Sequence, residues 1–447
     1  MKSQPTTADA YRLLHDGSLA LAEVEAAGMR VDVDRLDWTI VKADGKIKVL
    51  TERLKVDDVW KLWRRRFGER ASLGSRPQLG AVLFQEMGHK ASAITRTGRA
   101  QVDEEALARI DLPFVKLFLK VEKLKKLRST YLNGVKREVV NGFIHSVFNL
   151  HLVRSYRGSS DNPNIQNQPV RDPEMGKPIR SCFIPRDGHV LVEIDYSALE
   201  VRIAACYHKD PTMLEYIEDS SKDMHRDMAM QIYKLPQDQV TKQTRFAAKG
   251  QFVFASFYGS YYKQTAPGLW GAIEKDGLVT ADGVPLKKWL RGQGIRDLEE
   301  FTEHVQEVDQ DFWGRRFKVY AQWKLDWFRE YQRTGGFQML TGFRVDGVHK
   351  RNDVINYPVQ GAAFHVLLWS LIRLVKWLKK HKMRSVVVGQ IHDSIVADVH
   401  HDELDEYLAA AKRIMTEDVR KAWPWIIIPL ETEAEVGELN WWEKEKV

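Results

Sequence analysis

This sequence of 447 residues contains only two cysteines, Cys182 and Cys206. Two thiols cannot build a disulfide framework, and no spacing of cysteine and histidine matches a zinc site. The N-terminus has no basic start followed by an apolar run, so no signal peptide is expected. We therefore expect a reducing compartment.

Long apolar runs are also missing. The most apolar helical stretch, residues 364–378, is interrupted by Arg373 and Lys376, so a membrane span is not expected. The chain has no internal repeat and no low-complexity tract. Its hydrophobic content of 44% is enough to fold two or three packed units that share one scaffold.

Basic residues exceed acidic ones only slightly, with 68 Lys and Arg against 61 Asp and Glu, a net charge of +7 and a pI near 9.1. This is mild evidence for a polyanionic partner. The excess is clustered at residues 63–66, 123–128 and 379–382, where a solvated surface is the commoner explanation. Residues 37–67 and 112–139 are predicted to form long helices with basic outer faces, an arm of the kind that clamps a duplex.

Hydrophobic periodicity predicts the other elements. A helix that ends at Gly28 should bury Leu13, Leu19 and Leu21. The remaining predictions are strands over 144–152, 190–195, 384–391, 395–399 and 426–430, helices over 243–257 and 360–380, and a tight turn at 392–394.

Two aspartates stand at the ends of predicted strands. Alternation places Val190, Val192 and Ile194 on one face, and Glu193 and Asp195 on the other. A second apolar strand runs directly into the turn that carries Asp393. Either aspartate alone is more often a turn or helix cap, but two on one antiparallel sheet suit a pair of divalent ions that catalyse phosphoryl transfer.

A predicted helix carries a third candidate feature. Arg245 and Lys249 are four residues apart and therefore share a face, which suits a triphosphate, although an exposed basic pair is commonplace. Further along lie aromatic residues that are core by default but can also stack on a base: Phe252, Phe254, Phe257 and Tyr258.

These segments resemble the motifs of the family A DNA polymerases, the bacterial DNA polymerase I group and its phage relatives. Asp195-Tyr-Ser-Ala-Leu-Glu-Val-Arg202 resembles motif A, residues 245–259 resemble motif B, and Gln390-Ile-His-Asp-Ser394 resembles motif C, in the same order. Flanking matches extend the resemblance over nearly the whole chain: residues 75–80, 95–98, 126–131, 159–167, 356–361 and 429–433.

The resemblance implies an α+β fold, a right hand with an antiparallel palm sheet and helical fingers and thumb. Its expected division is listed here by residue number: an N-terminal segment on the palm, 1–36; thumb, 37–138; first part of the palm, 139–210; fingers, 211–358; second part of the palm, 359–447. No segment before Ala8 has room for a proofreading exonuclease domain, so 3′ to 5′ exonuclease activity is not expected.

The resemblance also implies the roles of individual residues. Asp195, Asp393 and the backbone carbonyl of Tyr196 should hold two Mg²⁺ ions, for which Mn²⁺ can substitute. Glu200 should exclude the ribose 2′ hydroxyl, and Lys249 is a candidate proton donor to pyrophosphate. The residues expected to contact the incoming nucleotide are Glu200, His225, Arg245, Lys249, Phe254 and Tyr258. Those expected to contact primer or template are Arg157, Asn164, Gln166, Asn356, Gln360 and His392.

Four positions depart from the family pattern. Ser394 replaces the usual glutamate of motif C, Ala198 replaces a common glutamine of motif A, and Tyr156 stands where glycine is usual. Motif B has one residue more than usual between Lys249 and Tyr258. Counting back from Tyr258 places Phe254 against the nucleotide base, whereas counting forward from Lys249 places Val253 there. We prefer Phe254, because a π-bulge can absorb the extra residue.

The resemblance implies template-directed DNA synthesis, in the cytoplasm of a bacterial cell or of a virus-infected host cell. The protein is expected to be a monomer that binds primer-template DNA and deoxynucleoside triphosphates. Three alternatives remain open. A single-subunit RNA polymerase shares the His-Asp-Ser turn, but Glu200 argues against it. A non-catalytic nucleic-acid clamp would not need the aspartates and cations together, and a metal-dependent nuclease would not need the triphosphate-facing helix.

Overall fold

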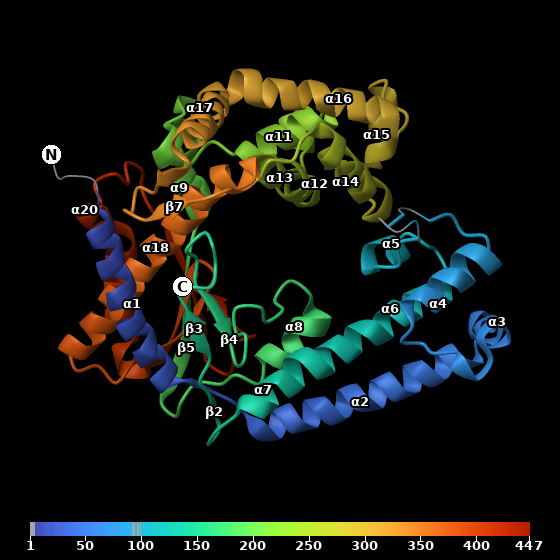
Figure 1. Ribbon diagram of the computed structural model, residues 1–447, viewed down its shortest axis with the longest axis horizontal. Coiled ribbons are helices and arrows are strands. Elements are labelled where there is room, and N and C mark those ends of the chain that lie inside the picture. Colours follow the sequence, from blue (N-terminus) through green and yellow to red (C-terminus); the bar gives the residue numbers. More distant parts are fainter. Residues whose placement is uncertain (1–4, 92–93, 96–97, 99) are drawn as a thin grey trace.

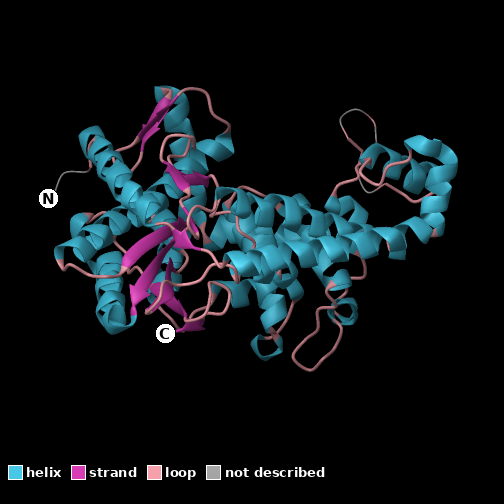
Figure 2. Ribbon diagram, turned by 90° about the horizontal axis from the view of Figure 1, so that it is seen from below, coloured by secondary structure: helices cyan, strands magenta, loops and turns pink. Residues whose placement is uncertain are grey.

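The computed structural model describes residues 5–91, 94–95, 98 and 100–447. Two residues of the matched segment 95–98 lie outside this described part. A helical lobe and a long helical arm lie on opposite sides of the molecule, and both are joined to a sheet (Figure 1). The strands gather at one end, and helices make up the rest (Figure 2). The expected α+β class is confirmed.

The main sheet has five antiparallel strands in the order β11-β10-β5-β9-β8. Their bounds are β5 His189–Tyr196, β8 Val386–Ile391, β9 Ser394–His400, β10 Thr432–Gly437 and β11 Glu445–Lys446. The expected strand over 426–430 is wrong. Ile426, Ile428 and Leu430 are buried as alternation predicts, but the Pro429 carbonyl accepts a hydrogen bond from the Arg202 guanidinium, and ladder pairing begins only at Thr432.

Several helices cover one face of this sheet: α1 Thr7–Ala27, α9 Leu199–His208, α18 Arg351–Lys380, α19 Leu404–Arg413 and α20 Val419–Ala422. Helix α18 is long and apolar enough to cross a membrane by length and composition alone, and 83% of its most apolar stretch is buried inside the protein. In α1 the buried stripe includes Leu13 and Leu21, whereas Leu19 is 59% exposed and does not belong to it.

Helix α18 begins nine residues before the predicted start at 360, although it contains Pro358. A proline inside a helix has no N–H to donate to the carbonyl four residues earlier, here that of Val354. The indole N–H of Trp327 donates to this carbonyl instead, at 3.0 Å. A neighbouring helix therefore supplies the hydrogen bond that the sequence alone leaves missing.

The opposite face of the sheet packs on the base of the arm, residues 33–138. The arm contains α2 Val33–Val56, α3 Asp58–Phe67, α4 Arg76–Gly80, α5 Glu104–Ala108, α6 Pro113–Lys126 and α7 Asn133–Glu138. Near the sheet, Leu36 and Leu127 share a core with Leu191 and Val396. At the distal end a separate core forms around Trp63 and Phe118. Helix α8, Pro173–Arg180, lies beside the base of the arm.

The helical lobe, residues 211–334, has an aromatic core that includes Phe252, Phe301 and Phe312. Its helices are α10 Pro211–Glu218, α11 Met224–Tyr233, α12 Lys242–Ala248, α13 Ala255–Phe257, α14 Tyr262–Lys275, α15 Leu286–Gly292, α16 Leu298–Asp311 and α17 Lys318–Thr334. Short antiparallel pairs complete the fold: β1 Met29–Arg30 with β2 Phe143–Ile144, β3 Val147–Asn149 with β4 Ser159–Asp161, and β6 Gly336–Gln338 with β7 Arg344–Asp346. The single strand expected over 144–152 is thus two short ones.

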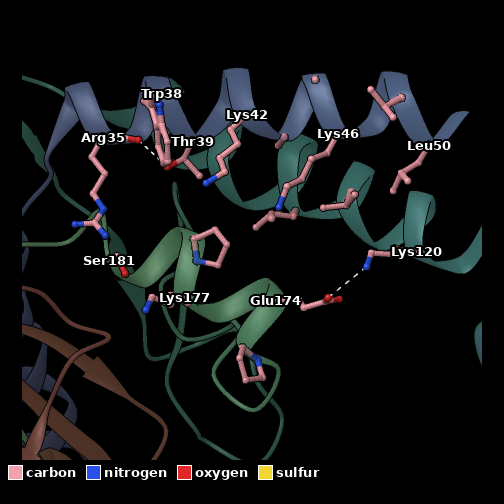
Figure 3. A pocket seen from close by; sticks show the side chains of 17 residues that line it. Arg35, Trp38, Thr39, Lys42, Lys46, Leu50, Lys120, Glu174, Lys177 and Ser181 are labelled. Carbon is pink, nitrogen blue, oxygen red and sulfur yellow. Dashed lines mark hydrogen bonds and ion pairs between the residues drawn. The ribbon is translucent and has the colours of Figure 1, made fainter. Parts of the chain in front are cut away.

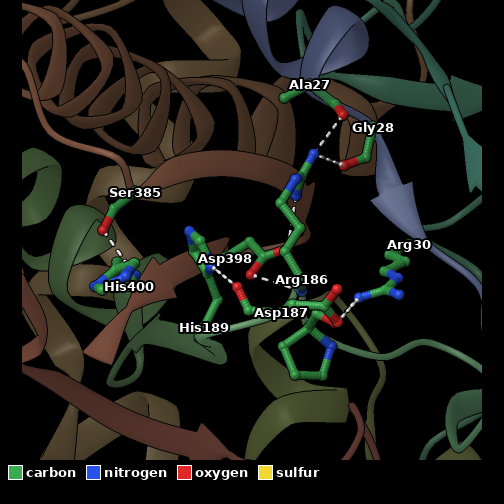
Figure 4. Close-up of polar contacts among 10 residues, drawn as sticks. Ala27, Gly28, Arg30, Arg186, Asp187, His189, Ser385, Asp398 and His400 are labelled. Atoms are coloured by element: carbon green, nitrogen blue, oxygen red, sulfur yellow. Dashed lines mark hydrogen bonds and ion pairs between the residues drawn. The ribbon is translucent and has the colours of Figure 1, made fainter. Parts of the chain in front are cut away.

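A buried ion pair ties the sheet to the end of α1 (Figure 4). The Arg186 guanidinium donates to Asp398 at 2.6 Å and to the carbonyl of Ala27 at 2.7 Å. Asp398 is only 1% exposed, and this burial raises the pKa of its carboxyl although Arg186 opposes the shift. Removing one partner of such a pair leaves the other buried without compensation.

We therefore expect Asp398→Ala to lower the free energy of unfolding by about 3 kcal/mol, measured by urea denaturation. The matched control is Asp187→Ala, which removes the nearby pair with Arg30. The Asp187 side chain is 95% exposed, so this variant should unfold at nearly the same urea concentration as the unaltered protein. Equal losses in the two variants would contradict the assignment.

Candidate active site

Asp195 and Asp393 lie side by side at one end of the sheet. Asp195 is the penultimate residue of β5, and Asp393 occupies the turn between β8 and β9. Asp195 is paired with Ser394 across the two strands, and the backbone N–H of Tyr196 donates to the carbonyl of Asp393 at 3.1 Å. Two residues almost two hundred positions apart in the sequence therefore meet at one point.

The surroundings of the two carboxyls disfavour negative charge. Burial raises the pKa of Asp195 to about 7. The negative charges of Asp393, Glu193 and further acids add to this shift. Burial and Glu200 raise the pKa of Asp393 to about 6, against the effect of Arg157. A cation bound between the carboxyls would relieve this repulsion.

The donor set fits a metal ion that is shared with a substrate. Among the described residues, no group of three or more His, Cys, Asp or Glu is placed to hold a metal. Mg²⁺ commonly binds through one or two carboxylates and completes its shell with phosphate oxygens and water. The hydroxyl of Tyr196 donates to the Met415 carbonyl at 2.7 Å inside the core, which leaves the backbone of Tyr196 as the part able to serve the site.

The raised pKa values predict how the stability of the metal-free protein depends on pH. An acid whose pKa is higher in the folded than in the unfolded state costs stability as pH rises from about 4 to about 7. We expect Asp195→Asn to raise the free energy of unfolding by roughly 1–2 kcal/mol at pH 8, a value reduced for the solvent exposure of the carboxyl. Thermal unfolding in the presence of a chelator should show the gain at pH 8 and its near loss at pH 4; a gain independent of pH would contradict this.

A cavity of about 350 Å³ opens beside Asp393. It brings together eight of the predicted site residues: Arg157, Glu200, Phe254, Tyr258, Asn356, Gln360, His392 and Asp393. Arg171 also lines it, and the sequence analysis missed this residue because it lies in an irregular loop without periodicity. Asn164 and Gln166 do not line the cavity, but Gln166 donates to Gln390 of β8 at 2.6 Å and so lies next to the turn.

Glu200 is held from two sides at the start of α9. The hydroxyl of Tyr258 donates to one of its oxygens, and the Arg157 guanidinium donates to the other at 2.9 Å. The residue before α9, Ala198, has a left-handed backbone with a φ of 51°. This conformation costs a residue with a side chain roughly 1 kcal/mol, and such strain is concentrated at functional sites. The carboxylate is therefore fixed in position before any ligand binds.

The extra residue of motif B is absorbed as predicted. Lys249–Phe254 forms a π-helical turn between α12 and α13. Val253 is fully buried in the core of the helical lobe, whereas Phe254 is half-buried and lines the cavity. Of the two candidates for contact with a nucleotide base, Phe254 is thus the one at the cavity surface.

Cationic and neutral groups adjoin Phe254. The Nζ of Lys249 lies 5.2 Å from the centre of its ring, and the His225 ring packs edge-on at 5.6 Å. Burial lowers the pKa of His225 to about 4, with help from Lys249 and Arg245, so the imidazole is neutral at pH 7. Arg245 donates to Asp223, the N-cap of α11, at 2.5 Å. Two cations and a neutral imidazole suit an extended anion.

Comparisons with known proteins agree with this geometry. The model of DNA polymerase family A matches residues 52–272 and 343–443, well over half of the chain. The chain belongs to DNA polymerase family A. It is 28% identical to DNA polymerase I of Pseudomonas aeruginosa, over 94% of this chain and 43% of the relative, and 28% identical to the thermostable DNA polymerase I of Thermus thermophilus, over 94% and 47%.

A solved structure of the family confirms the right-hand polymerase fold. The POL domain of Pol1 from M. smegmatis, in complex with DNA primer-template and dNTP, superposes with a TM-score of 0.76 at 26% identity, covering 95% of this chain and 69% of that one. The chain spans less than half of the length of the curated relatives it matches. Polymerases of family A generally depend on divalent metal ions.

This family A chain lacks the motif C glutamate on β9, but a glutamate of the neighbouring strand β5 contacts the residue that replaces it. Ser394 replaces the motif C glutamate, and its hydroxyl donates to Glu193 of β5 at 3.0 Å. Burial would raise the pKa of Glu193, but Lys444 and further donors lower it, so this acid stays charged. The indole of Trp441 donates to it at 2.9 Å. The sequence analysis assigned no role to Glu193, although alternation placed it on the face of Asp195.

Proposed function

We propose that this chain extends the 3′ end of a primer with deoxynucleoside triphosphates as directed by a DNA template. One observation carries the proposal: Asp195 and Asp393 meet beside a cavity whose wall contains Glu200, Phe254 and Tyr258. A clamp without catalysis would not need two carboxylates with raised pKa values, and a nuclease would not need a fixed acid in the same cavity wall as Phe254.

The catalytic roles follow from charge and position. Two Mg²⁺ ions, or Mn²⁺ in their place, would be held by Asp195, Asp393 and the Tyr196 carbonyl; when bound, they activate the primer 3′ oxygen and offset charge on the departing pyrophosphate. Arg245 and Lys249 bind the triphosphate as cations, and neutral His225 adds a hydrogen bond. Lys249 donates a proton to the leaving pyrophosphate.

Selection of the correct nucleotide depends on shape. Phe254 stacks on the incoming base, and Tyr258 lies beside the template base. Primer and template near the growing end are contacted by Arg157, Asn164, Gln166, Asn356, Gln360 and His392. Contacts on the minor-groove side test the shape of a base pair and do not read its sequence, because correct pairs look alike there.

The structural division that we propose follows the right hand. The thumb comprises residues 37–138 and the fingers 211–358, and the palm is formed by 139–210 and 359–447 with residues 1–36 packed on it. Tyr331 and Phe337, near the end of the proposed fingers, are buried in the core that α18 shares with the sheet. Movement of the fingers is therefore expected to involve the lobe before Tyr331.

Replacement of Glu200 tests the choice of DNA over RNA synthesis. A carboxylate held by Tyr258 and Arg157 leaves no room for a ribose 2′ hydroxyl, so Glu200→Ala should raise ribonucleotide incorporation relative to deoxynucleotide incorporation by roughly tenfold to a hundredfold. Primer extension with each nucleotide set measures the ratio. Glu218→Ala, at an exposed glutamate at the end of α10, is the control. Efficient ribonucleotide use by the unaltered chain without a primer would instead favour an RNA polymerase.

A further inference from the structure

A groove of about 710 Å³ lies between α2, α6 and α8 (Figure 3). It shares no lining residue with the cavity beside Asp393. Its floor is aliphatic and includes Leu50, Leu124 and Leu127. Helix α8 contributes Pro173 from its first turn and Pro178 from its interior. Val49 is 54% exposed at its edge. The groove thus leaves apolar surface uncovered on the outside of the molecule.

Cations surround this floor. Arg35, Lys42 and Lys46 come from one side of α2, and the side chains of Lys42 and Lys46 extend toward the hollow in Figure 3. None of these three has a carboxylate partner among the residues that the structure describes. Lys120 and Lys177 complete the rim, and within the described lining Glu174 is the single acid, at 3.5 Å from Lys120. The groove therefore presents an apolar floor inside an excess of positive charge.

This combination favours a peptide over a nucleic-acid strand. Single-stranded nucleic acid needs exposed aromatic faces on which successive bases stack. In the described lining Trp38 is the only aromatic residue, and the Nζ of Lys42 lies 4.3 Å from the centre of its ring. An aliphatic floor between helices instead suits the apolar anchors of an amphipathic helix.

We propose that this groove binds an acidic amphipathic segment of a partner protein, with leucine or phenylalanine anchors on the floor and carboxylates at the lysine rim. Arg35 and Lys46 are eleven positions apart on α2, or about 16 Å along its axis, which matches three turns of a partner helix. The apolar anchors supply most of the binding energy, and the rim charges select an acidic sequence and speed its association.

The probe is a fluorescein-labelled peptide of 14 residues with leucine and phenylalanine at helical spacing and glutamate elsewhere, measured by fluorescence anisotropy with the whole chain. Lys42→Glu combined with Lys46→Glu should weaken binding about tenfold. Lys48→Glu, an exposed lysine on the same helix outside the groove, should change it less than twofold. As a control, a peptide in which glutamine replaces every glutamate should bind the unaltered chain with no higher affinity than it binds the double variant.

The same assay can overturn the proposal. Equal losses in Lys48→Glu would show attraction by overall charge, and no binding at millimolar peptide would show that the groove does not take such a segment. Displacement of the peptide by an oligothymidylate, together with weaker oligothymidylate binding in the double variant, would assign the groove to nucleic acid. Val49→Asp, on the apolar edge of the groove, should also weaken binding of the peptide. Circular dichroism checks that each variant is folded.

Discussion

Primer extension should fall on the order of 10³-fold or more when Asp393 is replaced by asparagine. The amide keeps the size of the carboxyl but removes the charge that, with Asp195, would attract divalent ions to the turn between β8 and β9. Binding of primer-template should change less than about twofold, because the proposed duplex contacts, which include His392 of this turn, are made by residues other than Asp393. Single-turnover extension and fluorescence anisotropy measure the two quantities separately.

The control for this variant lies at the other end of the same hairpin. Asp402→Asn alters an exposed carboxyl that pairs with Arg384 just beyond β9, and it should leave extension within twofold. Normal extension by Asp393→Asn would remove the metal assignment and leave a nucleic-acid clamp as the better explanation. Equal loss of extension and of duplex binding would point to misfolding of the turn.

Lys249→Met should lower the rate of nucleotide addition by roughly 10²-fold to 10³-fold while preserving duplex affinity. Methionine keeps the apolar stem against Phe254 but loses the charge and the proton of the ammonium group. The matched control is Lys242→Met, an exposed lysine at the start of α12. An unchanged rate of nucleotide addition in Lys249→Met would contradict a role for Lys249 in the reaction.

Much of the sheet was predictable because its strands obey simple alternation. Val190, Val192 and Ile194 are buried on one face of β5, and Asp195 lies on the other face near the end of the strand. Two of the expectations that failed have an identified physical cause. The strand expected over 426–430 does not join the ladder because Arg202 binds the Pro429 carbonyl. The start of α18 was placed too late because Pro358 is a helix breaker unless a remote donor such as Trp327 is present.

The sequence predicted the features of the site that depend on residues within one segment. It did not predict contacts between segments that are far apart in the sequence. The spacing of Lys249 and Tyr258, which is one residue longer than the family pattern, predicted the π-helical turn. The link between Glu193 and Ser394 joins residues two hundred positions apart, and a pattern within one segment does not contain such a contact. Charge patterning likewise showed that the arm is basic, but not that Lys42 and Lys46 flank an apolar groove.

The pairing of β5 with β9 has a consequence for synthesis on the ribosome. Every ladder contact between these strands joins residues about two hundred positions apart, and β10, on the other side of β5, follows later still. Such remote contacts form slowly because a long loop must close first. A nascent chain that has exposed its arm and helical lobe still lacks half of the acidic pair, so the proposed site can form only after β8, β9 and β10 have emerged and closed the sheet.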